Sequence, residues 1–389
     1  MSEINASNFK KEHGDLAPDL VGVTELTSPY FFVPPSGTTA ERPEDCEPGT
    51  LRFNTDHGSL EIFRGKTIGW EQIQGRESQY LGGGTGSNTG TGTRGLMFNP
   101  SITGDGETNL IEFITISTMG AQQDFGDSTV SARQRGGLGN STRAMACAGT
   151  TTAPSKTDTI DFVTVSSTGN ATDFGNFHSS ATGSPSGVSN QTRGIFAGGE
   201  VPSQTNIICY VTISQTGNTV DFGDLTAARN TISGGVNSTR GLYCGGNPNS
   251  KTNIIDFITM ASTGDAADFG DLTVEKRNAG KGQASNATRH IVYGGQITPS
   301  VTNSIEFVTI ATLGNGIDFG DASTPIESSM AMASSTRAVF AGGNENDDTT
   351  HTRIDSMEFA TRGEVTSFGT LAPSAASGGV GISNGHGGL

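Results

Sequence analysis

The stretch Gly234–Thr273 reads GGVNSTRGLYCGGNPNSKTNIIDFITMASTGDAADFGDLT. Short runs of β-branched and aromatic residues (LYC, IIDFITM and ADFGDLT) alternate with turns rich in Gly, Asn and Ser (NSTRG, GGNPNS and STGD). Runs of this length and composition, bounded by such turns, are typical of strands in antiparallel sheets. The stretch therefore predicts four antiparallel strands joined by tight turns.

The same pattern is written six times along the chain. The arginines of its Thr-Arg pairs are Arg94, Arg143, Arg193, Arg240, Arg289 and Arg337. The phenylalanines of its Phe-Gly pairs are Phe125, Phe174, Phe222, Phe269, Phe319 and Phe368. Strand-rich repeats of roughly 40–50 residues are typical of propeller blades. We therefore expect an all-β, six-bladed β-propeller over residues 93–389.

The first repeat lacks a first strand of its own, because the sequence before Arg94 is LGGGTGSNTGTGT. The C-terminal segment from Ser377 to Ser383, SGGVGIS, matches the first strand of the other repeats. We expect this segment to complete the first blade.

The repeats resemble the kelch repeat, in which four apolar residues precede a Gly-Gly doublet and an aromatic residue lies in the third strand. The doublets begin at Gly198, Gly245, Gly294 and Gly342. The first two repeats depart from this pattern with LMFNP and AMACAGT, and Phe stands in place of the fourth-strand Trp of the family. The resemblance implies the propeller architecture and leaves function open, since propellers host many functions.

Five repeats carry the triplet Asp-Phe-Gly, which holds magnesium in protein kinases. Its aspartates are Asp124, Asp173, Asp221, Asp268 and Asp318, and the sixth repeat has Ser367 instead. A triplet that every repeat needs, and that loses its carboxylate once, favours a packing role for the Phe over metal binding. We expect the Gly to allow close approach of the next blade and the Asp to accept backbone hydrogen bonds.

Other repeated residues are interpreted in the same way. The six arginines either form an anion-binding ring or brace neighbouring repeats, and bracing is favoured because the whole set is repeated. Third-strand aromatics are assigned at Phe113, Phe162, Tyr210, Phe257, Phe307 and Phe359. Third-strand acids, expected at a surface or bracing position, are assigned at Glu112, Asp161, Asp256, Glu306 and Glu358. Asn140, Asn190, Asn237 and Asn286 lie in glycosylation-type sequons but suit turns.

Composition narrows the classes of function. The chain has 389 residues, a formal charge of -16 and only 16% charged residues, with no basic run to bind nucleic acid. It has no apolar stretch long enough for a membrane span and no apolar leader at its start. Cys46, Cys147, Cys209 and Cys244 lack zinc-type spacing and are expected to be reduced. We find no catalytic constellation and no cofactor signature, so we expect a non-enzymatic protein.

The connections between second and third strands vary most, and variable loops are where binding residues tend to lie. The interaction residues predicted in these loops are Asp105, Glu107, Lys156, Asn247, Asn249, Lys251, Asn344, Asp347 and Asp348. The acidic run NENDD, at 344–348, offers oxygen ligands for Ca²⁺ but does not match an EF-hand loop, so a solvated loop is favoured.

The N-terminal part is organised differently. Residues 1–43 are expected to form an extended attachment arm, 44–78 a β-hairpin module and 79–92 a glycine-rich linker. Within the module, TLRFN, LEIFR and WEQI alternate as a small β-meander, which is too short to stand alone and needs a partner or copies of itself.

This module resembles the short hairpin modules of tailed-phage fibre proteins. Gly49–Thr55, Leu60-Glu61, Phe63 and Gly69-Trp70 carry the resemblance. Together with the kelch-like repeats, it implies a virion structural protein of tailed cyanobacterial phages, assembled in the host cytoplasm. The arm would then bind other virion proteins, the propeller loops would contact a host receptor, a glycan or a neighbouring subunit, and the chain would form homo-oligomers. Two alternatives stay open: a virion protein that only decorates or braces the particle, and a carbohydrate-active propeller enzyme.

Overall fold

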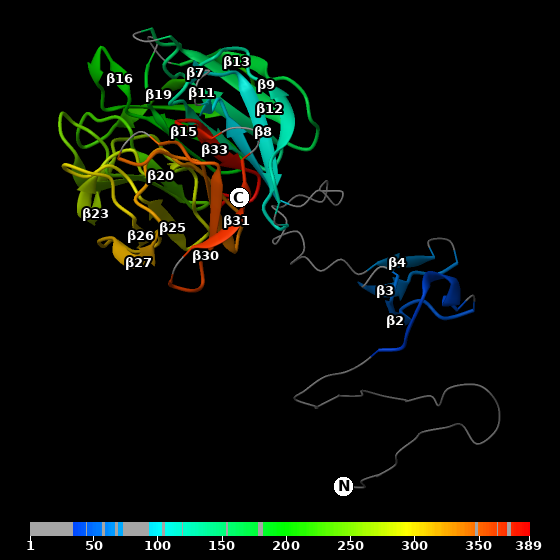
Figure 1. Cartoon of the computed structure of the whole chain (residues 1–389). Coiled ribbons are helices and arrows are strands. Elements are labelled where there is room, and N and C mark those ends of the chain that lie inside the picture. The colour runs from blue at the N-terminus through cyan, green and yellow to red at the C-terminus, as the bar shows by residue number, and fades with distance from the viewer. Residues whose placement is uncertain are drawn as a thin grey trace, which may run out of the picture. The chain divides into compact units, whose positions relative to one another are not determined.

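The computed structural model describes residues 34–43, 45–56, 59–66, 69–72, 93–102, 106–118, 120–152, 155–177, 182–346, 349–363, 365–371 and 375–389. The chain divides into two compact units, Met1–Gly75 and Arg76–Leu389 (Figure 1). Both are built from β-strands, and the described residues include one three-residue 3-10 helix and no α-helix. The predicted all-β class is therefore confirmed. No helix in the described ranges is long and apolar enough to cross a membrane.

The described residues of the first unit form one small sheet with the strand order β1-β2-β3-β4. Its elements are β1 (Ser36–Gly37), η1 (Thr39–Glu41), β2 (Leu51–Asn54), β3 (Ser59–Phe63) and β4 (Trp70–Gln72). β1 pairs with β2 in parallel, and the other pairs are antiparallel. The residues of β1 and η1 fall in the stretch predicted to be an extended attachment arm, and β1 belongs to the sheet.

The second unit repeats one arrangement of strands. Its strands are β5 (Arg94–Phe98), β6 (Ser101–Ile102), β7 (Gly106–Glu107), β8 (Leu110–Thr115), β9 (Gln123–Asp127), β10 (Gly136–Gly139), β11 (Arg143–Cys147), β12 (Thr159–Thr164), β13 (Thr172–Asn176), β14 (Ser186–Ser189), β15 (Arg193–Ala197), β16 (Glu200–Val201), β17 (Ser203–Gln204), β18 (Ile207–Thr212), β19 (Val220–Asp224), β20 (Ser233–Val236), β21 (Arg240–Cys244), β22 (Thr252–Thr259), β23 (Ala267–Lys276), β24 (Lys281–Gly282), β25 (Arg289–Tyr293), β26 (Ser304–Thr309), β27 (Ile317–Asp321), β28 (Met330–Ala333), β29 (Arg337–Ala341), β30 (Arg353–Glu358), β31 (Thr366–Thr370), β32 (Ala376–Ser377) and β33 (Val380–Ser383). In Figure 1 the repeats follow one another around the unit, from cyan β8 through green and yellow to orange β30.

Most repeats form a four-stranded antiparallel sheet. The second, third and fourth repeats give the sheets β10-β11-β12-β13, β14-β15-β18-β19 and β20-β21-β22-β23. The first and sixth repeats join in a nine-stranded sheet with the order β31-β30-β29-β28-β24-β33-β5-β8-β9. The fifth repeat departs from the expected four strands, because its sheet contains only β25, β26 and β27.

The C-terminal strand joins the first repeat, as the sequence predicts. β33 runs antiparallel to β5, with Val380 opposite Phe98. The strand is shorter than expected, since Ser377 belongs to β32, which pairs with β6. The side-chain Oδ1 of Asn384, the residue after β33, accepts the backbone N–H of Arg94 at 2.8 Å. The turn of the first repeat is thus built from residues at both ends of the unit.

Two cyclic arrangements connect the six repeats. The first strands touch one another in the order β33, β10, β14, β20, β24, β28 and back to β33. Beside them, six residues with positive φ each donate a backbone N–H to the carbonyl of the equivalent residue in the preceding repeat, over 2.7–3.3 Å. These residues are Gln134, Ser184, Thr231, Asn278, Ser328 and Gly378. Because Gln134 donates to Gly378, this hydrogen-bond ring is closed.

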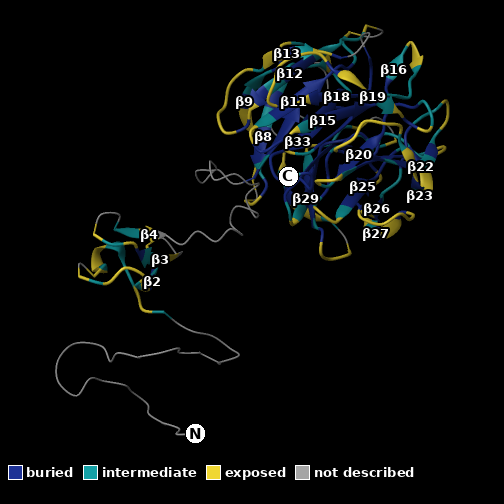
Figure 2. Cartoon of the chain, turned by 180° about the vertical axis from the view of Figure 1, so that it is seen from behind, coloured by how far each residue is buried: buried dark blue, intermediate teal, exposed yellow. Residues whose placement is uncertain are grey.

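The hydrophobic core lies between neighbouring sheets. One cluster combines Leu138 and Phe174 of the second repeat with Phe196 and Val211 of the third, and all four are buried. Figure 2 shows buried residues along the strands of this unit and exposed residues at its turns. Each sheet therefore buries both faces against its two neighbours, which explains its nearly continuous apolar strands.

Candidate functional site

The six repeated arginines brace neighbouring repeats. Each Nη1 donates to the carbonyl of the residue that follows the third strand of the next repeat. The pairs are Arg94–Val165, Arg143–Ile213, Arg193–Met260, Arg240–Ile310, Arg289–Phe359 and Arg337–Ile116. The last pair links the sixth repeat to the first, so this ring is closed as well. The geometry is that of the bracing hypothesis and leaves these Nη1 groups committed to carbonyls.

Five of these arginines also lie over an aromatic ring of their own repeat. The guanidinium carbon of Arg240 is 4.7 Å from the ring centre of Phe257, and the other four distances are 4.6–4.8 Å. In the sixth repeat Arg337 instead pairs with Glu358, at 2.8 Å. A charge placed over a ring face is attracted by its quadrupole, so the arginine holds the third strand as well as the next repeat.

The sixth repeat corrects two assignments made from the sequence. Arg337 lies opposite Glu358, whereas Arg240 lies opposite Thr259. Glu358 and Phe359 are therefore three positions beyond the acid and aromatic positions of the other repeats. The equivalent acid is Asp355, opposite Phe340, and the aromatic position holds Ser356. The error arose because Glu-Phe at 358–359 repeats the acid-aromatic order of Glu306 and Phe307.

The Phe-Gly residues pack between repeats, as predicted. The six phenylalanines are at most 3% exposed, and five of them meet a third-strand ring edge-on at 5.8–6.2 Å. A Cβ on Gly223 would come within 2.4 Å of the Gly264 carbonyl in the next repeat, so only glycine fits. The preceding aspartates, such as Asp221, are exposed. The described residues contain no group of three His, Cys, Asp or Glu placed to hold a metal ion.

Three of the third-strand acids are buried bracing groups. Asp161 pairs with Arg135, Asp256 with Arg229 and Glu306 with Lys276, at 2.5, 3.0 and 2.7 Å, and all six side chains are at most 1% exposed. Glu112 has no cation partner among the described residues and accepts a hydrogen bond from Gln122. Burial raises the pKa of Glu112 to about 7, because the charged form loses its hydration.

The asparagines of the sequon-like turns act as turn residues. The Oδ1 of Asn237 accepts the backbone N–H groups of Thr239 and Arg240 at 3.0 and 2.8 Å. The other three asparagines make the same two bonds. In addition, Asn237 Nδ2 donates to the Ala287 carbonyl of the next repeat. The sequence-based interpretation as turn chemistry is therefore confirmed.

The predicted interaction loops lie along one rim and contact one another. Residues before each first strand bridge to residues after the second strand, as in Asn230 with Asn247 and Glu327 with Asn344. The Nζ of Lys156 donates to the Glu200 carbonyl of the next repeat at 2.8 Å. Such bridges hold the rim together and fix its loops.

The remaining predicted loop residues are also placed. Glu107 pairs with Arg133 at 3.1 Å, and the Nζ of Lys251 donates to Thr298 Oγ1 of the next repeat at 2.8 Å. Asn249 adopts a positive φ of 117°. Asp105, Asp347 and Asp348 lie outside the described residues. The described residues of these loops therefore include polar contacts from one repeat to the next.

The centre of the unit holds a polar cluster that sequence reasoning missed. Gln283 Nε2 donates to Ser189 Oγ at 3.0 Å, and His386 Nε2 lies 2.9 Å from the Gly139 carbonyl. The fifth repeat contributes His290, whose Nδ1 lies 3.2 Å from Ser285 Oγ. Burial lowers the pKa of His290 and His386 to about 4, so both are neutral at pH 7. The two histidines are far apart in the sequence, so no local motif signals the cluster.

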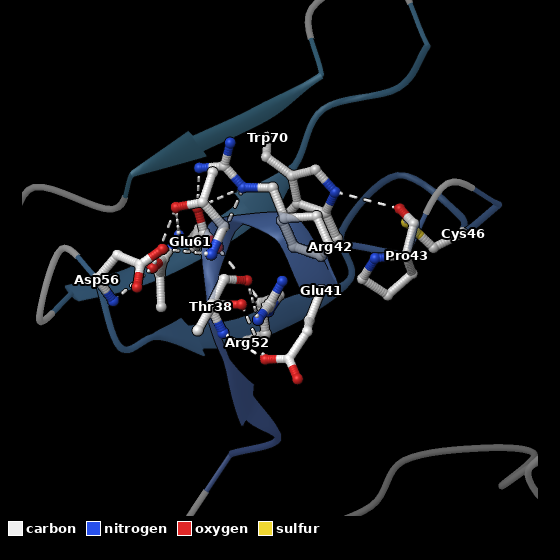
Figure 3. A network of polar contacts seen from close by, with 11 residues as sticks. Thr38, Glu41, Arg42, Pro43, Cys46, Arg52, Asp56, Glu61 and Trp70 are labelled. Carbon is white, nitrogen blue, oxygen red and sulfur yellow. Dashed lines mark hydrogen bonds and ion pairs between the residues drawn. The ribbon is translucent and has the colours of Figure 1, made fainter.

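The first unit contains a second polar network, centred on Glu61 (Figure 3). Glu61 is fully buried and pairs with Arg42 and Arg52. Removal from water raises the pKa of its carboxyl, but hydrogen bonds from Arg42 and Asn54 outweigh this and hold the pKa below its usual range. Trp70 packs on Phe63 at 5.5 Å and donates from Nε1 to the Pro43 carbonyl. This network ties the segment before β2 to the sheet.

The opposite face of this small sheet carries exposed apolar side chains beside the ion pair of Arg64 with Glu71. Leu51 and Leu60 are 46% and 40% exposed. Their cross-strand partners, Ile62 and Phe53, are only partly buried. We call these four side chains the apolar face of the first unit.

The cysteines and cavities add no reactive centre in the described ranges. All four cysteines are free, as expected, and burial raises the pKa of Cys209 to about 12. A cavity of about 410 Å³ lies beside Asn303, Asp321 and Val365, between the fifth and sixth repeats. It is open to solvent, and Asp321 is the one charged residue among those that line it.

Comparison with known proteins gives no family: no protein-family model matches the chain, and no curated protein is similar to it. The functional argument therefore rests on the geometry described above.

Proposed function

We propose that the second unit is a six-bladed, kelch-like β-propeller. The closed arginine ring, the closed backbone ring and the cycle of first strands support this architecture, because each contains one member per repeat. Closure through β33 supports it further, since a C-terminal strand that completes the first sheet fixes both ends of the unit. In this architecture β24 is the innermost strand of the fifth blade, and it pairs with β28 and β33 at the centre of the unit.

We further propose that the protein is a non-enzymatic structural protein of a tailed-phage virion. The first unit attaches it to other virion proteins, and the loop rim of the propeller contacts a host surface or a neighbouring subunit. The observation that carries this proposal is the apolar face of the first unit. A sheet of this size that turns two leucines to water gains stability when another surface covers them.

The loop rim suits presentation for a different reason. Its polar groups are tied from one repeat to the next by pairs such as Lys156 with Glu200 and Lys251 with Thr298. Loops held in this way lose little conformational freedom when they bind a partner, which favours affinity. The rim therefore offers a preorganised polar surface on a rigid support.

The test uses full-length chains in cells that produce the phage encoding this protein. Tagged wild type, the double variant Leu51→Asp with Leu60→Asp, and the control Leu313→Asp are expressed, and their copies in purified particles are counted. Leu313 is a matched control because it is 61% exposed and lies in the second unit. We expect the wild type and the control in particles and at least a tenfold loss of the double variant. Absence of the wild type would overturn the virion assignment, and normal incorporation of the double variant would overturn the attachment face.

A further inference from the structure

The fifth repeat is irregular where its chain enters the centre of the second unit. Arg277 and Arg289 lie two positions further apart than the equivalent Asn230 and Arg240. The extra length lets β24 leave its own sheet and pair in parallel with β28 and β33 through Gly282. β24 also contacts β10, β14 and β20, so it touches the first strands of all five other repeats. Only the fifth repeat has a displaced first strand, so the packing that all six repeats share does not explain it.

This irregularity brings a lysine to the centre. Lys281 is 4% exposed and lines a cavity of about 10 Å³ together with Arg135, Gly137, Ser186 and Val380. Its Nζ has no hydrogen-bond partner and no ion pair among the residues that the structure describes.

The other buried cations of the described chain are all paired. Arg52 pairs with Glu61, Arg135 with Asp161, Arg229 with Asp256 and Lys276 with Glu306. Lys281 therefore differs from every other buried lysine or arginine in this part of the chain. An unpaired buried ammonium is costly, so the group either loses its proton or gains an anion.

The charges around Lys281 leave it partly protonated at neutral pH. Burial and the nearby Arg133 lower its pKa to about 7, while Glu327 opposes them. Arg133 is already paired with Glu107, and Glu327 accepts a hydrogen bond from Asn278. The neighbouring Arg135 is neutralised by Asp161. None of these groups supplies a direct counterion to Nζ.

We propose that this central cavity binds a single halide ion, such as chloride, on the ammonium group of Lys281. The cavity has room for about one water-sized particle. Among common anions a monatomic halide comes nearest to this size, and phosphate and sulfate are larger still. The ligand class follows from one uncompensated cation in a space of atomic size.

The experiment measures the melting temperature of the full chain at constant ionic strength, in sodium chloride or sodium gluconate, at pH 6 and pH 9. We expect chloride to raise the Tm of the wild type by about 2–4 °C at pH 6, and less at pH 9, where the lysine is neutral. In Lys281→Met this difference should disappear, and the variant should be at least as stable as the wild type in gluconate. Lys66→Met, at a lysine whose side chain is 79% exposed in the first unit, should keep the chloride effect.

A second measurement does not depend on the variant folding. Crystals of the wild type grown in sodium bromide should show one anomalous peak within about 3.5 Å of the Lys281 Nζ. No chloride-specific stabilisation, or a chloride effect that persists in Lys281→Met, would overturn the proposal. A stabilisation by sulfate equal to that by chloride and dependent on Lys281 would also overturn it, because the cavity would then admit larger anions.

Discussion

In the sheet of the first unit three of the buried side chains, Arg52, Asn54 and Glu61, are polar and pack beside Phe63, and the open face carries Leu51 and Leu60. In the second unit rings and aliphatic side chains fill most of the space between sheets, and its buried polar groups are confined to ion pairs such as Arg135 with Asp161 and to the central cluster. Both units are built from short strands that pair mainly in antiparallel fashion. What differs is the surface that each sheet finds to pack against.

A sheet needs no partner surface when neighbouring sheets cover both of its faces, and the closed ring of repeats in the second unit provides this cover. Each sheet of the second unit is covered on both faces by its neighbours, and the last strand returns to the first repeat. Among the described residues, the segment before β2 covers one face of the sheet of the first unit and brings Arg42 to the buried Glu61. A polar network of this kind stabilises one arrangement, and Leu51 and Leu60 on the other face stay exposed.

The largest effect is expected from the packing of the second unit. Phe269→Ala should lower its free energy of unfolding by about 3–5 kcal/mol, because the ring is 3% exposed and its removal leaves a cavity. Denaturant unfolding followed by circular dichroism measures this. Asp268→Asn, at the exposed neighbouring position, is the control and should change stability by less than about 0.5 kcal/mol. Equal losses in the two variants would contradict the packing role of Phe269.

The stability of the first unit is expected to depend on the polar network around Glu61. Glu61→Gln should destabilise this unit by about 3 kcal/mol, because it leaves the buried Arg52 without a counter-charge. Trp70 is the only Trp of the chain, so its fluorescence reports this unit separately from the second. Glu71→Gln breaks an exposed pair with Arg64 and should cost less than about 0.5 kcal/mol. If the two variants unfold at the same urea concentration, the network does not hold the unit.

Acid should weaken the second unit through its central histidines. The folded pKa of His386 is about 4, against 6.5 without burial, so the unfolded chain binds more protons between these values. Its stability contribution is present above pH 6.5 and is lost as the pH falls toward 4, by about 3 kcal/mol at most.

The matched variants are His386→Gln and His351→Gln, the second at a partly exposed histidine beside Glu345. We expect the free energy of unfolding to fall less steeply between pH 6.5 and 4.5 in His386→Gln than in the wild type. In His351→Gln the slope should equal that of the wild type. An unchanged slope in His386→Gln would mean that this histidine is not held neutral by the fold.

The repeat pattern allowed much of the second unit to be predicted. Turn residues recur with each strand set, so the pairing of β33 with β5 followed from the sequence alone. The fifth repeat was misjudged because AGKGQAS looks like any other first strand, and only the two extra residues distinguish it. Lys281 was missed for the same reason, since a single lysine in a glycine-rich strand carries no motif.

The first unit was harder to predict for a physical reason. Strict alternation in TLRFN places Leu51 and Phe53 on one face and Arg52 and Asn54 on the other. The usual rule turns the apolar face inward. Here the segment around Arg42 covers the polar face instead, and the sequence of the strands holds no sign of which face will be covered.

The smallest effect concerns one position that is filled differently from repeat to repeat. Asp256 is paired with Arg229, whereas Glu112 has only the amide of Gln122, and burial raises the pKa of Glu112 to about 7. Because the folded pKa lies above 4.5, this group's stability contribution is present at low pH and is lost as the pH rises through 7. Glu112→Gln should therefore be more stable than the wild type at pH 8, by about 1 kcal/mol, since solvent near this partly exposed group screens the effect. At pH 4.5 the two should unfold alike, because the carboxyl is then neutral in the fold.

The opposite sign is expected for Asp256→Asn, which leaves Arg229 unpaired. If both variants change the free energy of unfolding in the same direction at pH 8, then the presence of a cation partner does not decide whether a third-strand acid stabilises the fold.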